Sequence, residues 1–73
     1  MANLTKQFLI FLGKNIRKER LKMGVSQEKL GQLAGVHRTY VGMVERGEKN
    51  ITLSNMMRFA QALGLKVRDL IDF

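Results

Sequence analysis

The amino-acid sequence predicts an all-α fold, a compact bundle of five helices that forms a single domain over residues 1–73. Three observations indicate this class. Apolar residues recur at intervals of three and four along most of the chain, which is the spacing of amphipathic helices. Glycines stand where these patterns end, as they do after helices. The chain has 73 residues and is 45% hydrophobic, which suits one small globular domain.

The first predicted helix runs from Leu4 to Met23 and contains no proline. Four apolar residues at helical spacing form its predicted inner face: Leu9, Leu12, Ile16 and Met23. Phe8 and Phe11 lie beside this stripe, where they could cover another edge of the core or a partner. Basic residues lie away from the stripe, which also suits an amphipathic helix on an anionic membrane surface. We favour a core helix, because the rest of the chain forms a coherent domain.

Two short helices are predicted in the segment from about 26 to 46. The first runs from Gln27 to about Ala34, and the hydroxyl of Ser26 precedes it as a cap for free backbone N–H groups. Gly35 then ends this helix and starts a turn. The apolar residues of the helix are Leu30, Leu33 and Ala34.

The second short helix begins near His37 or Arg38, runs to Arg46, and is followed by Gly47. Two helices joined by a short turn that contains glycine are typical of a helix-turn-helix. Val41 lies at the centre of the inner face of this second helix. On or beside the outer face lie Arg38, Thr39, Gly42, Met43 and Arg46. Such a face fits the major groove of DNA, and an ordinary solvated face is the alternative.

Three residues of this outer face are candidates for reading bases: Arg38, Thr39 and Arg46. Arg38 carries a planar, two-pronged donor in the first turn, which enters the groove first, and its expected target is guanine O6 and N7. Arg46 lies at the other end of the face and is expected at a phosphate or the groove edge. Gln27 and Tyr40 are candidates for the DNA backbone. The alternatives are a plain first-turn residue for Gln27 and a core ring with an exposed hydroxyl for Tyr40.

Opposite charges are predicted on two helix faces that should pack together. Arg20 lies on the apolar face of the first helix, near Ile16, and Glu45 lies beside Val41 on the inner face of the second motif helix. We interpret them as a buried, hydrogen-bonded ion pair. The alternative is that both side chains reach water independently.

The C-terminal third of the chain predicts two further helices. Five apolar residues form the inner stripe of the first: Leu53, Met56, Phe59, Ala60 and Leu63. A final helix is predicted from Leu65 to Phe73, with Val67, Leu70 and Ile71 facing inward. A small core and surplus apolar residues predict a homodimer with two-fold symmetry. The candidate interface residues are Met57, Leu65 and Val67.

Composition restricts the classes of function. The formal net charge of +7 favours a polyanionic partner such as DNA. The chain has no cysteine and His37 is its single histidine, so we expect no metal site and no cofactor. It contains no glycine-rich phosphate loop of known spacing, and we predict no enzymatic activity. No apolar run approaches the roughly 18 residues needed to span a bilayer. Because most of the chain forms a coherent domain, we also expect no binding to a membrane surface.

The segment SQEKLGQLAGVHRTYVGMVERGEKNITLSNMMRFAQALG resembles the Cro/repressor (XRE-like) type of bacterial helix-turn-helix domain, which has a lambda-repressor-like fold. The matching residues are Gln27, Leu30, Ala34, Gly35, Val36, Val41, Glu45 and Gly47, followed by ALGL at 62–65. Within it, HRTYVGMVERGEKNITL is similar to the controller proteins of restriction–modification systems. The resemblance implies the Arg20–Glu45 pair. It also implies a loop that runs along the DNA backbone, with Lys49, Asn50 and Thr52 at phosphates, although Thr52 equally suits a helix cap.

Together these patterns predict a sequence-specific regulator of transcription that binds double-stranded DNA as a dimer, most similar to controllers of restriction–modification genes. RNA polymerase is a further candidate partner, and the expected location is the bacterial cytoplasm, at the nucleoid. Two alternatives stay open: a phage-type repressor or antitoxin, and a protein-interaction module that has kept the fold without DNA binding. The basic charge argues against the interaction module.

Overall fold

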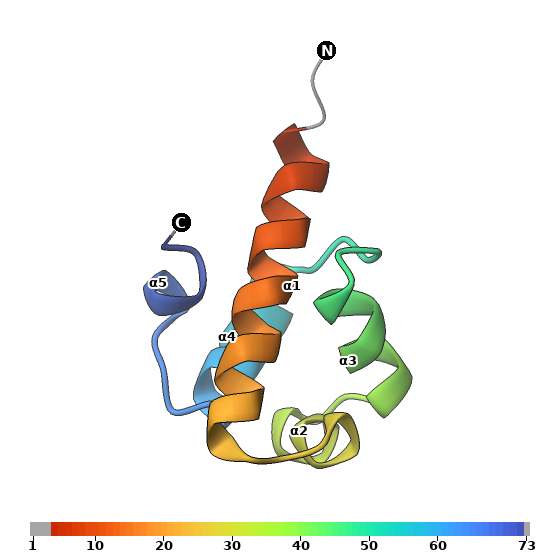
Figure 1. Cartoon of the computed structure of the whole chain (residues 1–73), viewed down its shortest axis with the longest axis vertical. Coiled ribbons are helices and arrows are strands. Elements are labelled where there is room, and N and C mark those ends of the chain that lie inside the picture. The colour runs from red at the N-terminus through yellow and green to blue at the C-terminus, as the bar shows by residue number, and fades with distance from the viewer. Residues whose placement is uncertain (1–3, 73) are drawn as a thin grey trace.

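The computed structural model describes residues 4–72, and these form five α-helices and no β-strand, as predicted (Figure 1). The helices are α1 (Leu4–Met23), α2 (Gln27–Ala34), α3 (Arg38–Glu45), α4 (Leu53–Ala62) and α5 (Val67–Leu70). α1 runs along the long axis of the molecule, with α3 and α5 on opposite sides of it (Figure 1). α4 lies behind α1 in this view, and α2 lies at the end of the molecule where α1 ends.

Local capping signals determine where the short helices begin and end. The hydroxyl of Ser26 accepts a hydrogen bond from the backbone N–H of Lys29 at 2.9 Å, and the hydroxyl of Thr52 accepts one from the N–H of Asn55 at 3.1 Å. Each bond satisfies a donor that the first turn of a helix leaves free. α2 ends at Gly35, whose φ of 75° lies in the left-handed region that glycine adopts without steric cost. The turn that leads into α3 is therefore built into the local sequence.

All five helices contribute side chains to one hydrophobic core. The largest fully buried side chains are Phe59, Leu12, Ile16, Leu30, Leu70 and Val41. Burying a side chain of this kind stabilises the fold by about 1.5–3 kcal/mol relative to leaving it in water. Because α2 and α3 both supply core residues, their orientation depends on packing against α1 and α4 as well as on the turn between them.

α1 approaches α3 closely at Gly13, and it is tied to α5 by a hydrogen bond. A Cβ atom at Gly13 would clash with the backbone oxygen of Val44 and stand 2.6 Å from that of Glu45. Backbone oxygens cannot rotate away as side chains can, so the distance between the two helices requires glycine at this point. On the other side of α1, the side-chain amide of Asn15 donates to the backbone oxygen of Leu70 at 2.8 Å.

Three residues that were predicted to face the core are instead exposed: Met23 (44%), Leu53 (63%) and Ile71 (38%). Leu33, one of the apolar residues of the first motif helix, is also exposed (47%). Met23 is the last residue of α1 and Leu53 is the first of α4, while Ile71 follows α5. The predicted apolar stripes thus extend beyond the length of helix that neighbouring elements cover. Leu33 is exposed because the buried face of α2 is narrow and consists of Leu30, Gly31 and Ala34.

The C-terminal end of the chain also differs from its prediction. The final helix, predicted from Leu65 to Phe73, covers only Val67–Leu70, and Phe73 lies outside the described residues. The backbone oxygen of Leu70 accepts its hydrogen bond from Asn15 rather than from a further helical turn.

Candidate nucleic-acid interface

The candidate recognition helix α3 begins at Arg38, and the side chain of the preceding residue, His37, caps it. Nδ1 of His37 accepts a hydrogen bond from the backbone N–H of Thr39 at 3.0 Å. Val41 and Val44 on the inner side of the helix are buried, whereas Arg38 and Thr39 in its first turn are exposed. The first turn therefore projects two polar side chains from a helix that is anchored in the core on its other side.

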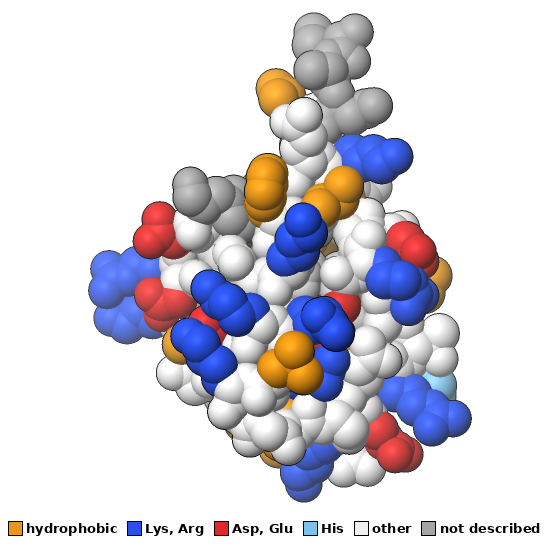
Figure 2. Space-filling model, in the orientation of Figure 1, with side chains coloured by type: hydrophobic (Ala, Val, Ile, Leu, Met, Phe, Trp, Pro, Cys, Tyr) orange, Lys and Arg blue, Asp and Glu red, His pale blue; other side chains and the backbone are white. Residues whose placement is uncertain are grey.

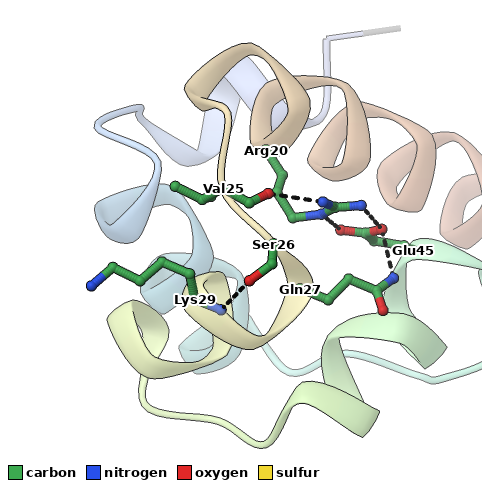
Figure 3. A network of polar contacts seen from close by, with 6 residues as sticks. All are labelled: Arg20, Val25, Ser26, Gln27, Lys29 and Glu45. Carbon is green, nitrogen blue, oxygen red and sulfur yellow. Dashed lines mark hydrogen bonds and ion pairs between the residues drawn. The ribbon is translucent and has the colours of Figure 1, made fainter.

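The structure brings Arg20 and Glu45 together in a buried ion pair (Figure 3). Nε of Arg20 donates to Oε2 of Glu45 at 2.6 Å and Nη2 donates to Oε1 at 3.1 Å, and the two residues are only 8% and 6% exposed. The third nitrogen, Nη1, donates to the backbone oxygen of Val25 at 2.9 Å. Every buried side-chain nitrogen or oxygen in the described part of the chain has a partner, so this network is fully satisfied. It joins α1, the segment before α2, and the last residue of α3.

Gln27 extends the same network into α2 (Figure 3). Its side-chain nitrogen donates to Oε1 of Glu45 at 3.1 Å, so the residue predicted at the DNA backbone makes an internal contact here. Its amide oxygen lies over Gly42, 3.5 Å from where a Cβ atom would stand. Gly42 was predicted on the outer face of α3, and this was wrong because it is buried beneath the side chains of Gln27 and Arg46. Helical periodicity places residues on the faces of a single helix, and it does not show which of them neighbouring side chains cover.

Arg46, at the C-terminal end of the outer face, is held by Glu48, a residue that the sequence pattern did not single out. Nε of Arg46 donates to Oε2 of Glu48 at 3.0 Å, and the side chains are 57% and 52% exposed. The hydrogen bond to Glu48, together with the charge of that carboxylate, raises the pKa of Arg46 above its ordinary value. The available signal was the opposite charge two residues along the chain, across Gly47.

Tyr40 lies half-buried between α3 and α4. Its ring is stacked on that of Phe59, with centroids 6.2 Å apart and an interplanar angle of 14°. Its hydroxyl accepts a hydrogen bond from the side-chain amide of Asn55 at 3.0 Å. The ring is thus part of the packing, while the hydroxyl keeps its own proton to donate.

The loop between α3 and α4 holds the remaining backbone candidates. Lys49 and Asn50 are both exposed. Thr52 caps α4, as one of the two interpretations of its role required. Its hydroxyl oxygen is used as an acceptor there, so the proton of that hydroxyl remains available to a further acceptor.

The candidate dimer residues differ in how much surface they offer. Met57 is 56% exposed on α4, whereas Leu65 and Val67 are partly buried and pack against the core. Leu53, which was assigned to the core, lies one turn before Met57 on the same side of α4 and is 63% exposed. The two side chains form an apolar strip that helical periodicity identified only in part.

The wider surface is basic. Lys and Arg side chains are spread over the face with α1 in front and reach the edge where α3 lies (Figure 2). Among residues 4–72, no three His, Cys, Asp or Glu side chains are grouped so that they could hold a metal ion. None of the helices in that range combines the length and apolarity that crossing a membrane would need.

Known proteins share this arrangement. Residues 16–70 match the helix-turn-helix family model HTH_3. The chain is 39% identical over 71 residues to the control protein C.BamHI of Bacillus amyloliquefaciens, covering 96% of this chain and 88% of that protein. The crystal structure of the restriction-modification controller protein C.AhdI from Aeromonas hydrophila superposes with a TM-score of 0.83 at 44% identity, covering 85% of this chain and 94% of that one. The P22 c2 repressor, solved in complex with a synthetic operator, superposes with a TM-score of 0.79 at 28% identity, covering 84% and 92%.

Proposed function

The chain belongs to the helix-turn-helix family HTH_3, and from this membership we propose that it is a sequence-specific transcriptional regulator that binds double-stranded DNA as a homodimer and controls restriction–modification genes. The observation that carries the proposal is the exposed first turn of α3, where Arg38 and Thr39 project from a helix fixed by buried contacts. Similarity to C.BamHI and C.AhdI supports the controller role. Similarity to the P22 c2 repressor on its operator supports operator binding.

In this proposal, bases and backbone are contacted by different residues. Arg38 donates two hydrogen bonds to guanine O6 and N7, and Thr39 beside it contacts a base edge or a thymine methyl. Arg46 lies at the other end of the same face. Lys49 and Asn50 hold the phosphates beside the loop.

Three further residues contact the DNA backbone while their side chains keep their contacts within the protein. The hydroxyls of Tyr40 and Thr52 accept hydrogen bonds within the protein, and each donates its own proton to a phosphate. Gln27 stands at the N-terminus of α2, where free backbone N–H groups and the helix dipole favour an anion. Its side chain stays on Glu45 and fixes the distance between α2 and α3.

The homodimer forms through the C-terminal third, with Met57 at its centre and Leu65 and Val67 beside it. The exposed Leu53 extends this strip along α4. Two-fold symmetry places the two copies of α3 about 34 Å apart, which matches half-sites one turn of DNA apart. The function is binding without catalysis, at the nucleoid in the cytoplasm, and RNA polymerase is the partner expected where the operator adjoins a promoter.

Site selection from a random DNA library tests this proposal, because it finds the operator without assuming its sequence. We expect a symmetric site with half-site centres about 10 base pairs apart, and an affinity that falls steeply with salt. Sedimentation equilibrium at micromolar concentration should give the mass of a dimer. Failure to enrich any sequence would favour the protein-interaction alternative. A monomer that remains a monomer on the selected site would exclude the dimer.

A further inference from the structure

Two neighbours, Glu48 and Gly42, determine where the guanidinium of Arg46 lies. Glu48 engages only Nε of its guanidinium, at 3.0 Å, which leaves the outer edge of the two Nη groups for another acceptor. Nη1 lies over Gly42, one helical turn back, 3.1 Å from where a Cβ atom would stand. The guanidinium therefore folds back over Gly42, beside the side-chain amide of Gln27, instead of extending freely from the end of the helix.

The pair has no evident role in holding the fold. Both side chains are more than half exposed, and exposed ion pairs contribute little to stability because water screens them. Glu48 also places a negative charge on the surface that the proposed function directs toward a polyanion. A carboxylate in that position disfavours contacts with phosphate at every DNA sequence alike.

We propose, on the basis of the DNA-binding function proposed above, that Glu48 is a positioning residue for sequence selectivity. It holds Arg46 across Gly42 so that the free guanidinium edge meets a base edge in the major groove, and its charge weakens the alternative in which Arg46 binds any phosphate. Specific sites then keep the Arg46 contact, while non-specific DNA loses it. Selectivity at this end of α3 comes from the pair and not from Arg46 alone.

The test compares Glu48→Gln with wild-type protein on the selected operator, on a library of single-base changes in it, and on random DNA. The substitution keeps the size of the side chain and removes its charge. We expect the ratio of operator affinity to random-DNA affinity to fall by about fivefold or more, mainly through tighter binding to random DNA. The lost preference should fall at the same base pairs that Arg46→Ala affects. Adding Glu48→Gln to Arg46→Ala should cause no further loss at those base pairs.

Glu19→Gln is the matched control, because Glu19 is also paired with a surface cation, Lys22 at 3.4 Å, but lies on α1. It removes the same charge and should leave the base preferences of the operator library unchanged. If Glu48→Gln keeps the wild-type ratio, or changes it only as much as Glu19→Gln does, the positioning role is wrong while the DNA-binding function stands. If wild-type protein itself does not distinguish its selected operator from random DNA, the proposed function fails and the role of Glu48 fails with it.

Discussion

The inner and outer sides of α3 are built from opposite kinds of contact. On the inner side, Val41 and Val44 are buried, Glu45 is engaged by the side chains of Arg20 and Gln27, and the helix backbone touches α1 at Gly13. On the outer side, Arg38 and Thr39 extend into solvent, and Arg46 is paired with the exposed carboxylate of Glu48.

This difference separates stability from recognition within one eight-residue helix. A change on the inner side disturbs packing, a buried charge or a helix–helix distance, and each of these effects lowers the free energy of unfolding. A change on the outer side removes an exposed side chain that we propose contacts DNA. It should therefore alter DNA binding and leave the fold intact. An inner substitution that leaves stability unchanged, or an outer substitution that unfolds the protein, would contradict this separation.

The largest effect is expected from Glu45→Ala or Arg20→Ala. Either change strands a charge or several donors in a site that is almost inaccessible to water, and loss of one partner of such a pair typically costs about 3–5 kcal/mol. For a domain of this size that corresponds to a midpoint lowered by roughly 15–30 °C in thermal unfolding followed by circular dichroism. Glu48→Ala, which breaks an exposed pair beyond the end of α3, is the control and should melt within a few degrees of wild type. Near-wild-type midpoints for both Arg20→Ala and Glu45→Ala would refute the structural role of the pair.

The sequence predicted the outline of both sides because those parts depend on local rules. The bounds of α1, the caps at Ser26 and Thr52, and the turn at Gly35 all follow from residues close to one another in the chain. The approach of Arg20 to Glu45 could be predicted because each charge lies on an otherwise apolar face.

The details that were missed depend on distances between helices. The burial of Gly42 requires knowing that Gln27 of α2 and Arg46 lie over it, and the role of Gly13 requires the separation of α1 and α3. The exposure of Leu53 depends on how far neighbouring elements extend along α4, and that of Leu33 depends on how narrow the covered face of α2 is. Periodicity describes one helix at a time, so it contains none of this information.

A smaller loss of stability is expected from Gly13→Ala. The added methyl group would meet the backbone of α3, and overpacking of this kind costs about 1–3 kcal/mol, partly offset by the higher helix propensity of alanine. Gly42→Ala is the matched control, because Gly42 is also helical and buried, but its Cβ would meet only the ends of two flexible side chains. We expect it to be close to neutral or slightly stabilising. Chemical denaturation of both variants measures the difference, and a Gly13→Ala protein as stable as Gly42→Ala would show that the α1–α3 distance is not constrained.

The smallest effect on stability, and the clearest effect on recognition, is expected on the outer side. Arg38→Ala and Lys49→Ala should both unfold within about 0.5 kcal/mol of wild type, because both side chains are exposed. Their binding defects should differ in kind. Arg38→Ala should weaken operator binding by about 1–3 kcal/mol per half-site and relax the preference at one base pair. Lys49→Ala should weaken all DNA sequences alike and flatten the salt dependence by about one unit per half-site.

Arg68→Ala is the control for loss of a positive charge, since Arg68 lies on α5, on the side of α1 away from α3 (Figure 1). Binding of the three variants would be measured against the operator library over a salt series. Because Arg38 lies in the first turn of α3, which enters the groove first, its loss should reduce the preference for one base pair and not only the overall affinity. If Arg38→Ala keeps the wild-type preference at every position, the base-reading role belongs to other residues of the outer side. If it also lowers the unfolding midpoint as Glu45→Ala does, the separation between the two sides of α3 does not hold.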